Sequence, residues 1–333
     1  MKRNAATAYI LLMAGTAVLL LANLMLGSVR IPAGEVVRTL LARGDNPIWS
    51  HIVLESRLPQ AITALLGGAA LSASGLMMQT LFKNPLAGPS ILGISDGANL
   101  GVAIVMIYFS AGSYLTTILA AFAGALVVLL VIIGFSKKVQ NNVMLLIIGI
   151  MMGYLASSLI SILNFRASAD KVHQYVLWGM GDFTAVSVEK LPWFCIFTVA
   201  GLAGAVMLIK PLNALLLGES YAANLGVKVK RTRVAILLVT GILTATVTAF
   251  CGPISFIGLA VPHIARLLLG SSNHRQLLPV TIIAGAATAL LCNLITILPG
   301  GSNMLPLNAV TAIIGAPIII YVIMNRRNIQ YFN

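Results

Sequence analysis

Long apolar runs separated by short polar segments extend along almost the whole chain. Within each run the apolar positions are continuous and do not alternate with polar ones, which is typical of membrane-spanning helices and excludes the strands of a β-barrel. Most runs are close to the roughly 20 residues that a helix needs to cross a hydrocarbon core. The predicted spans are residues 5–27, 59–82, 91–109, 113–136, 142–165, 190–209, 232–250, 254–269, 276–298 and 306–325.

Composition supports an all-α polytopic membrane protein with about ten transmembrane helices in a single domain, residues 1–333. The chain is 59% hydrophobic and 9% charged, whereas charged residues make up about a quarter of a soluble globular domain. The first apolar run is too long for a signal peptide and no clear cleavage site follows it. We therefore expect an uncleaved first span.

The net charge of +13 comes from basic residues at the ends of the spans. These residues are not interleaved with aromatic side chains, so we expect membrane lipid around the chain and no nucleic-acid partner. With the N-terminus inside, the cytoplasmic loops hold fourteen of the 21 Lys and Arg residues and the opposite face holds seven. The positive-inside rule therefore predicts that both termini lie in the cytoplasm.

Two segments on the predicted outer side, about 28–58 and 167–189, are too polar to span a membrane. Both carry charges of both signs, and we expect each to hold short interfacial helices. Paired charges on this face suit the docking of a soluble protein.

The segment at about 213–227 is the longest polar loop between two apolar spans on the side of the chain that is rich in Lys and Arg. It is rich in small residues, and basic residues flank it, with Lys210 before it and Lys228, Lys230, Arg231 and Arg233 after it. An ordered helical segment in such a loop indicates a docking element for a partner. The loop therefore favours a transporter that a separate subunit drives.

Sequence motifs for catalysis or metal binding are missing from the chain. The three cysteines, Cys195, Cys251 and Cys292, are widely separated in apolar runs and have no metal-ligand spacing. The histidines are scattered, and no P-loop, nucleophile elbow or H-E-x-x-H motif occurs. We predict that the chain is not an enzyme and holds no metal or cofactor, so that any ATP would be hydrolysed by another chain.

Small residues recur at a spacing of four in several spans, for example Gly93, Gly97 and Gly101 in the third. This spacing lets helix backbones approach closely, so we interpret the glycines mainly as packing positions. A lining of small residues along a translocation path is the alternative.

Polar side chains within the apolar runs are the candidates for a translocation path. Asp96 stands out, because a charge within a span is costly and often functional. It either caps a broken helix, with Ser95 and Asn99 solvating it, or takes part in transport. The candidate path residues are Gln79, Ser95, Asp96, Asn99 and Asn164.

Seven stretches together resemble one family, the permease subunits of ATP-binding-cassette (ABC) importers for ferric siderophores, haem and vitamin B12. The resemblance covers essentially the whole chain, in order. The stretches that carry it are residues 57–59, 75–89, 92–98, 178–181, 217–227, 252–266 and 315–317.

The resemblance implies a B12-importer-permease-like fold in a bacterial cytoplasmic membrane. It also implies a homodimer with the pathway at its two-fold axis, although a pair of paralogues remains an alternative. Two cytoplasmic ATPase subunits would bind ATP and Mg²⁺, and a periplasmic or lipid-anchored substrate-binding protein would dock on the outer face.

In that family the segment matching 217–227 is a coupling helix that enters a cleft on the ATPase. The resemblance assigns this role to Leu217, Gly218, Glu219, Tyr221, Ala222 and Gly226.

The family also uses outer-face arginines to meet acidic residues of the binding protein. Arg57 matches one such position, but Gln60 stands where a second arginine often follows, and the segment 298–303 has no basic residue. We therefore expect Arg57 to share docking with another outer arginine, such as Arg30.

Two functions compete on these observations. The first is an ABC importer permease for a siderophore, haem or cobalamin, among which the sequence does not choose. The second is an ion-coupled secondary transporter that uses Asp96, which would need further buried ionisable groups. A membrane enzyme is a third class, and it lacks a catalytic cluster.

Overall fold

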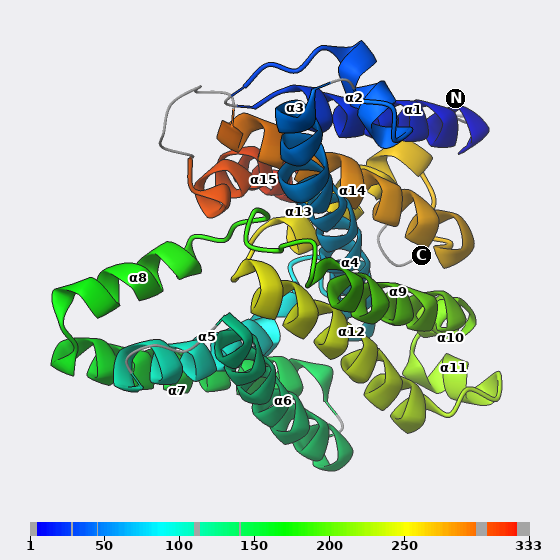
Figure 1. The fold of residues 1–333 in the computed structure, drawn as a ribbon. Helices are drawn as coiled ribbons and strands as arrows, with labels where there is room; N and C mark the ends of the chain where they lie inside the picture. The colour runs from blue at the N-terminus through cyan, green and yellow to red at the C-terminus, as the bar shows by residue number, and fades with distance from the viewer. Residues whose placement is uncertain are drawn as a thin grey trace.

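The structure is a computed structural model that describes residues 5–27, 29–44, 46–109, 114–139, 141–297 and 305–324. Every secondary-structure element in these ranges is a helix (Figure 1). Four of the basic residues used to predict orientation, Lys2, Arg3, Arg326 and Arg327, lie outside the described residues, as does the segment 298–303.

Seven helices of the described chain are long and apolar enough to cross a membrane. They are α1 (Ala5–Met25), α4 (Leu58–Phe82), α6 (Tyr114–Lys138), α7 (Asn142–Arg166), α12 (Val229–Cys251), α14 (His274–Ile297) and α15 (Leu307–Met324). An eighth candidate is formed by α9 (Leu191–Met207) and α10 (Ile209–Leu216), which are bent by 50° at the break between them. The predicted all-α polytopic class is confirmed.

The remaining two predicted spans are shorter apolar helices. One is α5 (Ile94–Ala103), which follows the 3₁₀ turn η2 (Pro89–Leu92) and continues into the π-helical turns η3 (Ile104–Tyr108). The other is α13 (Ile257–Leu269), which continues through Pro262 even though an internal proline removes one backbone hydrogen bond. Each predicted run is therefore helical, while ten full-length crossings stay a prediction.

Three helix boundaries differ from the prediction in ways that matter for the site. The helix α12 begins at Val229, so Lys230 and Arg231, which lie before the predicted span 232–250, are helical. The helix α10 extends to Leu216, so the start of the predicted loop 213–227 is helical. On the outer side, α3 (Pro47–His51) and the π-helical turns η1 (Ile52–Arg57) run directly into α4, so the predicted outer segment 28–58 ends inside a continuous helix.

Short helices occupy the two polar outer segments, as predicted. The first segment holds α2 (Ala33–Leu40) and α3, and the second holds α8 (Ala169–Gly179). The side chain of Asn46 accepts hydrogen bonds from the N–H groups of Ile48 and Trp49, which satisfies the free donors at the start of α3. In Figure 1, α8 lies at the left, and α10 and α11 (Glu219–Asn224) lie at the opposite, right-hand side.

The long helix α4 lies at the centre of the bundle, between α12 and α14 (Figure 1). Its small residues allow very close helix packing, because a Cβ at Gly75 would collide with the carbonyl of Gly258 in α13. Likewise, Gly97 and Gly101 of α5 pack against the backbone of α6. The packing interpretation of the glycine spacing is therefore confirmed at Gly97 and Gly101.

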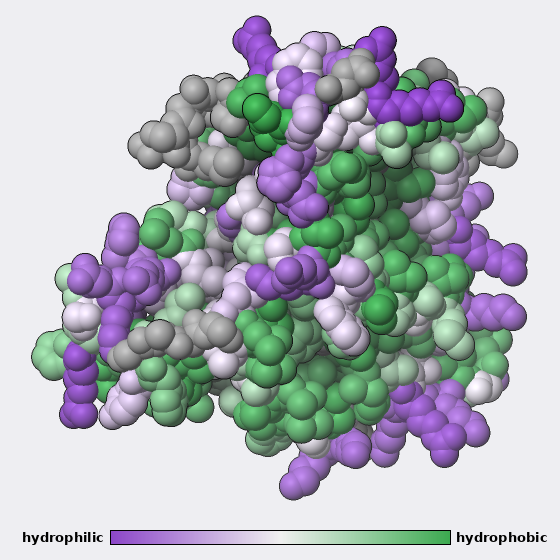
Figure 2. Space-filling model, in the orientation of Figure 1, coloured by the Kyte–Doolittle hydropathy of each residue, from purple (hydrophilic) through white to green (hydrophobic). Residues whose placement is uncertain are grey.

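The surface has the distribution of a membrane protein. Figure 2 shows hydrophobic residues over the middle of the molecule and hydrophilic residues mainly toward its edges. Many large apolar side chains of α6, α7 and α15 are exposed, including Leu126, Leu155 and Ile313. In water such surface would be costly, whereas lipid or another membrane subunit covers it without penalty.

Candidate coupling site

The predicted docking segment folds as a short helix, α11, with a glycine at each end. Gly218 has a φ of +111° and Gly226 a φ of +84°, and both values favour glycine over residues with a Cβ. At the end of α11 the N–H groups of Gly226 and Val227 bond back to the carbonyls of Ala223 and Ala222. This arrangement resembles the glycine-terminated ends common in helices. The two glycines thus explain why the chain turns sharply before and after α11.

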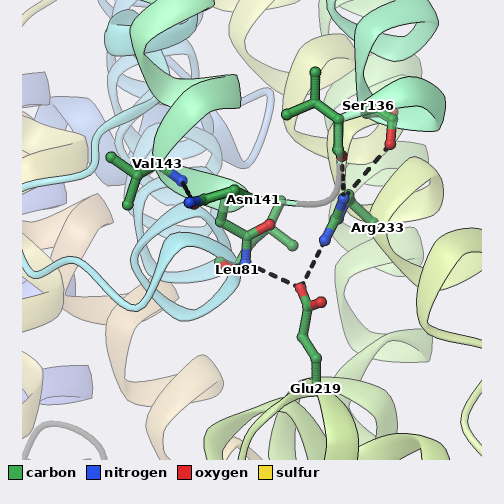
Figure 3. A network of polar contacts seen from close by, with 8 residues as sticks. Leu81, Ser136, Asn141, Val143, Glu219 and Arg233 are labelled. Carbon is green, nitrogen blue, oxygen red and sulfur yellow. Dashed lines mark hydrogen bonds and ion pairs between the residues drawn. The ribbon is translucent and has the colours of Figure 1, made fainter.

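The inner face of α11 is held by Glu219. One carboxylate oxygen, Oε1, accepts a hydrogen bond from Nη2 of Arg233 at 2.8 Å and another from Nδ2 of Asn142 at 3.0 Å. Figure 3 shows the Glu219 side chain pointing from α11 toward the Arg233 guanidinium. Arg233 comes from the first turns of α12 and Asn142 is the first residue of α7. Glu219 therefore joins α11 to two spanning helices.

The two donors also reach the ends of two further helices. Nη1 of Arg233 donates to the carbonyl of Val139 at 3.1 Å and lies 3.5 Å from that of Ser136, at the end of α6. Nδ2 of Asn142 donates to the carbonyl of Leu81, near the end of α4, at 3.0 Å. These carbonyls are the groups that a helix leaves without a partner at its C-terminus. We call Glu219, Arg233 and Asn142 the cytoplasmic network.

Burial differs sharply within this network. The Arg233 side chain is 5% exposed and that of Glu219 is 35% exposed. A buried guanidinium needs a compensating charge and acceptors for its N–H groups. Here the carboxylate supplies the charge, and the negative end of the α6 dipole adds to it.

Three large apolar side chains in and beside α11 are exposed. Tyr221 lies within α11, Leu225 follows its last residue, and Leu217 caps the end of α10 just before Gly218; 58%, 60% and 57% of their surfaces are exposed. Ala222, the residue after Tyr221, is fully buried. We call Leu217, Tyr221 and Leu225 the α11 stripe. Large exposed apolar side chains grouped at the basic end of the molecule are typical of a contact surface for another protein.

Two of the candidate path residues make contacts within the bundle instead. Gln79 is completely buried, and its Nε2 donates to the carbonyl of Leu259 at 3.1 Å while its Oε1 accepts from Nη1 of Arg266 at 2.6 Å. It therefore joins α4 to α13, which argues against a place on the path, and the path role of Gln79 stays a prediction. Ser95 lies with its hydroxyl 3.4 Å from that of Thr248 and contacts α12 in the same way.

The other candidates are half-buried on α5 and α7. The Asp96 carboxylate packs against Gly153 of α7, where a Cβ would come within 2.6 Å of Oδ2. It also lies close enough to α8 that burial, and secondly the charge of Asp96, raise the pKa of Tyr175 to about 12. The Oδ1 atoms of Asn99 and Asn164 are buried without a hydrogen-bond partner among the described residues. Whether these side chains line a path stays a prediction.

The two predicted docking arginines are placed differently. Arg30 is exposed, as expected. Arg57 is only 6% exposed, and its guanidinium donates to the carbonyls of Leu24 and Met25 at 2.9 Å each and to that of Val29. Its donors are thus used inside the chain, at the end of α1. These contacts argue against direct docking through Arg57, and its docking role stays a prediction.

Sequence reasoning did not single out Arg233 or Asn142. Arg233 was counted only as one of several basic residues near the loop, and no sequence signal distinguishes it from Arg231. Asn142 follows Asn141, whose side chain caps α7 by accepting from the N–H of Val143. A pair of asparagines before an apolar run indicates one cap, and the second side chain is then available for another contact. Within the described chain, no group of three or more His, Cys, Asp or Glu residues is placed to hold a metal ion.

Comparison with known proteins identifies the family. The profile of the FecCD transport family matches residues 15–325. The vitamin B12 import system permease protein BtuC of Klebsiella pneumoniae subsp. pneumoniae is 36% identical over 311 residues, which cover 93% of this chain and 91% of the relative. BtuC of Salmonella typhi is 36% identical over 286 residues, 86% of each chain.

Solved structures agree with this assignment. An inward-facing structure of an ABC transporter assigned to the metal-chelate type superposes with a TM-score of 0.85 and 28% identity, covering 96% of this chain and 99% of the other. PsaBC from Streptococcus pneumoniae, in complex with Fab, has a TM-score of 0.52 at 16% identity and covers 87% of this chain and 95% of the other, so it supports the fold alone. The predicted family resemblance is confirmed, and it decides against an ion-coupled secondary transporter. The chain belongs to the FecCD transport family and is the permease subunit of an ABC importer, a multi-pass protein of the cytoplasmic membrane.

Proposed function

We propose that the chain transports a metal chelate of the class that includes cobalamin, ferric siderophores and haem. We further propose that a separate ATPase subunit drives this transport by binding α11. The observation that carries the proposal is the α11 stripe, with its three exposed apolar side chains. Two of the similar proteins support the substrate class, since BtuC is the permease of a vitamin B12 import system and the transporter of 28% identity is assigned to the metal-chelate type.

The α11 stripe suits insertion into a cleft on a soluble partner. Its apolar side chains lose water on binding, which contributes roughly 25 cal/mol for each Å² of apolar surface removed from water. Exposed basic residues flank the stripe, namely Lys210, Lys228, Lys230 and Arg231. Such a basic rim speeds encounter with an acidic partner surface and fixes its orientation. The partner is therefore a cytoplasmic protein with an apolar cleft and an acidic rim, as an ATPase subunit would provide, with ATP and Mg²⁺ bound by that subunit.

A second copy of the chain would complete the translocation path. α7 is the spanning helix with the most polar exposed face, which includes Tyr154, Ser157, Ser158 and Ser161. Hydroxyl groups facing lipid lose hydrogen bonds with water, so polar faces of spanning helices usually face protein or a water-filled path. A dimer that brings two α7 helices together would place these residues along a shared path, and a substrate-binding protein would deliver the chelate at the outer side.

The test is a pull-down of the tagged chain from its native membrane in a mild detergent. We expect an ATPase subunit to be recovered with the unmodified chain and lost with Tyr221→Glu, because a charge on the stripe opposes its burial. Tyr108→Glu is the matched control, since Tyr108 is 68% exposed at the other end of the molecule, and it is expected to retain the ATPase. Failure to recover any ATPase with the unmodified chain, despite an intact permease, would overturn the proposal.

A further inference from the structure

We infer that Arg233 and Asn142 are positioning residues that make α11 move together with the ends of α4, α6, α7 and α12, so that the cytoplasmic network transmits the ATPase movement to the spanning helices. This inference rests on the proposed function, because it requires a partner that moves α11. It assigns a role to two residues that contact neither the partner surface of α11 nor the candidate path.

The backbone of α11 alone gives a weak mechanical connection. The helix has six residues, and an isolated helix of this length is unstable without tertiary contacts. Both of its flanking glycines adopt conformations with positive φ, and glycine permits a wide range of backbone angles. A force applied to α11 at Tyr221 would therefore be absorbed at these two glycines unless side chains held the buried face of the helix.

The side chain of Glu219 makes that connection, and it acts on helix ends. Through Arg233 the carboxylate is linked to the carbonyls of Ser136 and Val139, and through Asn142 to that of Leu81. A guanidinium presents its donors in a fixed planar fork, so it holds Glu219 and the α6 end in a defined relative position. The network thus connects α11 directly to four helices that contribute to the bundle (Figure 3).

Burial makes separation of the network unfavourable. If α11 moved away alone, Arg233 would keep its buried position and lose its carboxylate, and a buried charge without its partner is strongly disfavoured. If α11 and the helix ends move together, every hydrogen bond of the network is retained. The joint movement of α11 and the helix ends is therefore favoured, and it is the one that can change the arrangement of the spanning helices around the path.

The experiment measures whether α11 and the end of α6 keep their distance during the ATPase cycle. Spin labels at Asn224→Cys, in α11 and outside the α11 stripe, and at Lys138→Cys, both exposed positions, report this distance by pulsed electron paramagnetic resonance in the purified complex with its ATPase. We expect one narrow distance distribution that ATP leaves unchanged when the network is intact. With Arg233→Met, which removes the buried charge and keeps a long side chain, we expect the distribution to broaden and shift on addition of ATP.

Three further variants keep the result interpretable. Arg275→Met removes an exposed arginine from the first turn of α14, outside the basic rim of the α11 stripe, and is expected to match the intact network. Arg233→Lys restores the charge without the planar fork, and we expect an intermediate shift. Asn142→Ala removes the connection to α4 and stands in for Arg233→Met if that variant does not fold, with a smaller shift in the same direction.

The outcomes separate this inference from the proposed function. Recovery of the ATPase with Arg233→Met, together with an ATP-dependent distance change, supports the inference. An unchanged distance in both Arg233→Met and Asn142→Ala, or an ATP-dependent change already present in the unmodified chain, overturns it while the ATPase interaction stands. Absence of the ATPase from the unmodified complex overturns the proposed function and this inference together.

Discussion

Two buried arginines at opposite ends of the bundle have the same local chemistry and different surroundings. Arg57 and Arg233 are 6% and 5% exposed, and each donates to carbonyls at the C-terminal end of a helix, α1 for Arg57 and α6 for Arg233. Arg233 also pairs with a carboxylate on a half-exposed helix, whereas the hydrogen bonds described for Arg57 all go to backbone carbonyls. The first arginine therefore stabilises the fold, and the second connects the fold to a surface that a partner can move.

The largest effect that would test this comparison is expected at Arg57. Arg57→Ala removes a side-chain donor from three carbonyl oxygens, of which only that of Met25 keeps a backbone donor within the described chain, and opens a cavity, so we expect the free energy of unfolding to fall by about 3 kcal/mol. A thermal melt in detergent measures the change, with the exposed Arg43→Ala as control. An unchanged melting temperature combined with loss of substrate-binding-protein association would restore the docking role that the structure argues against.

Gln79 extends the comparison to a third buried arginine, Arg266, which is 4% exposed. Gln79→Leu removes the acceptor of its Nη1 and leaves a buried guanidinium group with one hydrogen bond fewer. We expect a loss of about 2 kcal/mol in the same thermal melt. The matched control is the exposed Gln276→Leu. If Gln79→Leu leaves stability unchanged and lowers transport alone, the residue belongs to the path after all.

Glu219→Ala removes the carboxylate partner of Arg233, which is the feature that distinguishes the surroundings of Arg233 from those of Arg57. Because Glu219 is about one-third exposed, water partly replaces it, and we expect a loss of only about 1 kcal/mol. In combination with Arg233→Met the loss should be less than additive, since each change removes the same interaction. Glu189→Ala, at an exposed acid, is the control, and strictly additive losses would show that the two side chains are not coupled.

The smallest effect on stability is expected for the exposed outer arginine. Arg30→Ala should change the free energy of unfolding by less than about 0.5 kcal/mol. If Arg30 takes part in docking, the change slows association with the substrate-binding protein at low ionic strength, and the difference shrinks as salt screens the charge. A stopped-flow salt series measures this, and an association rate that is insensitive to both salt and the substitution would remove Arg30 from the docking surface.

The bundle itself was largely predictable from the sequence, because a continuous apolar run in a chain of this composition has few alternatives to a membrane helix. The α11 segment was predictable for a related reason, since two glycines bracket a short polar-tipped helix at the basic end. Both inferences depend on local composition, which the sequence carries directly.

The roles of individual polar residues were less predictable, because burial depends on which helix ends meet. Arg231 is exposed, whereas Arg233, two residues later, is buried and contacts the end of α6 and Glu219 of α11. Arg57 carries a family motif, but the sequence does not reveal that the end of α1 turns over it. Gln79 was interpreted as a path residue because it is polar within a span, and the structure gives it partners on α13.

The continuous helix from Pro47 to Phe82 has 36 residues, which at 1.5 Å per residue corresponds to about 54 Å. The hydrocarbon core of a bilayer is only about 30 Å thick, so one unbroken rod extends well beyond the span that lipid requires. Its outer end lies beside α2, and the carbonyl near its inner end is the one that Asn142 holds. A tilt of about 10° over such a rod would displace its far end by roughly 9 Å. A small tilt of this helix, caused by a soluble protein that binds its outer end, would thus displace its cytoplasmic end by more than the rise of one helical turn.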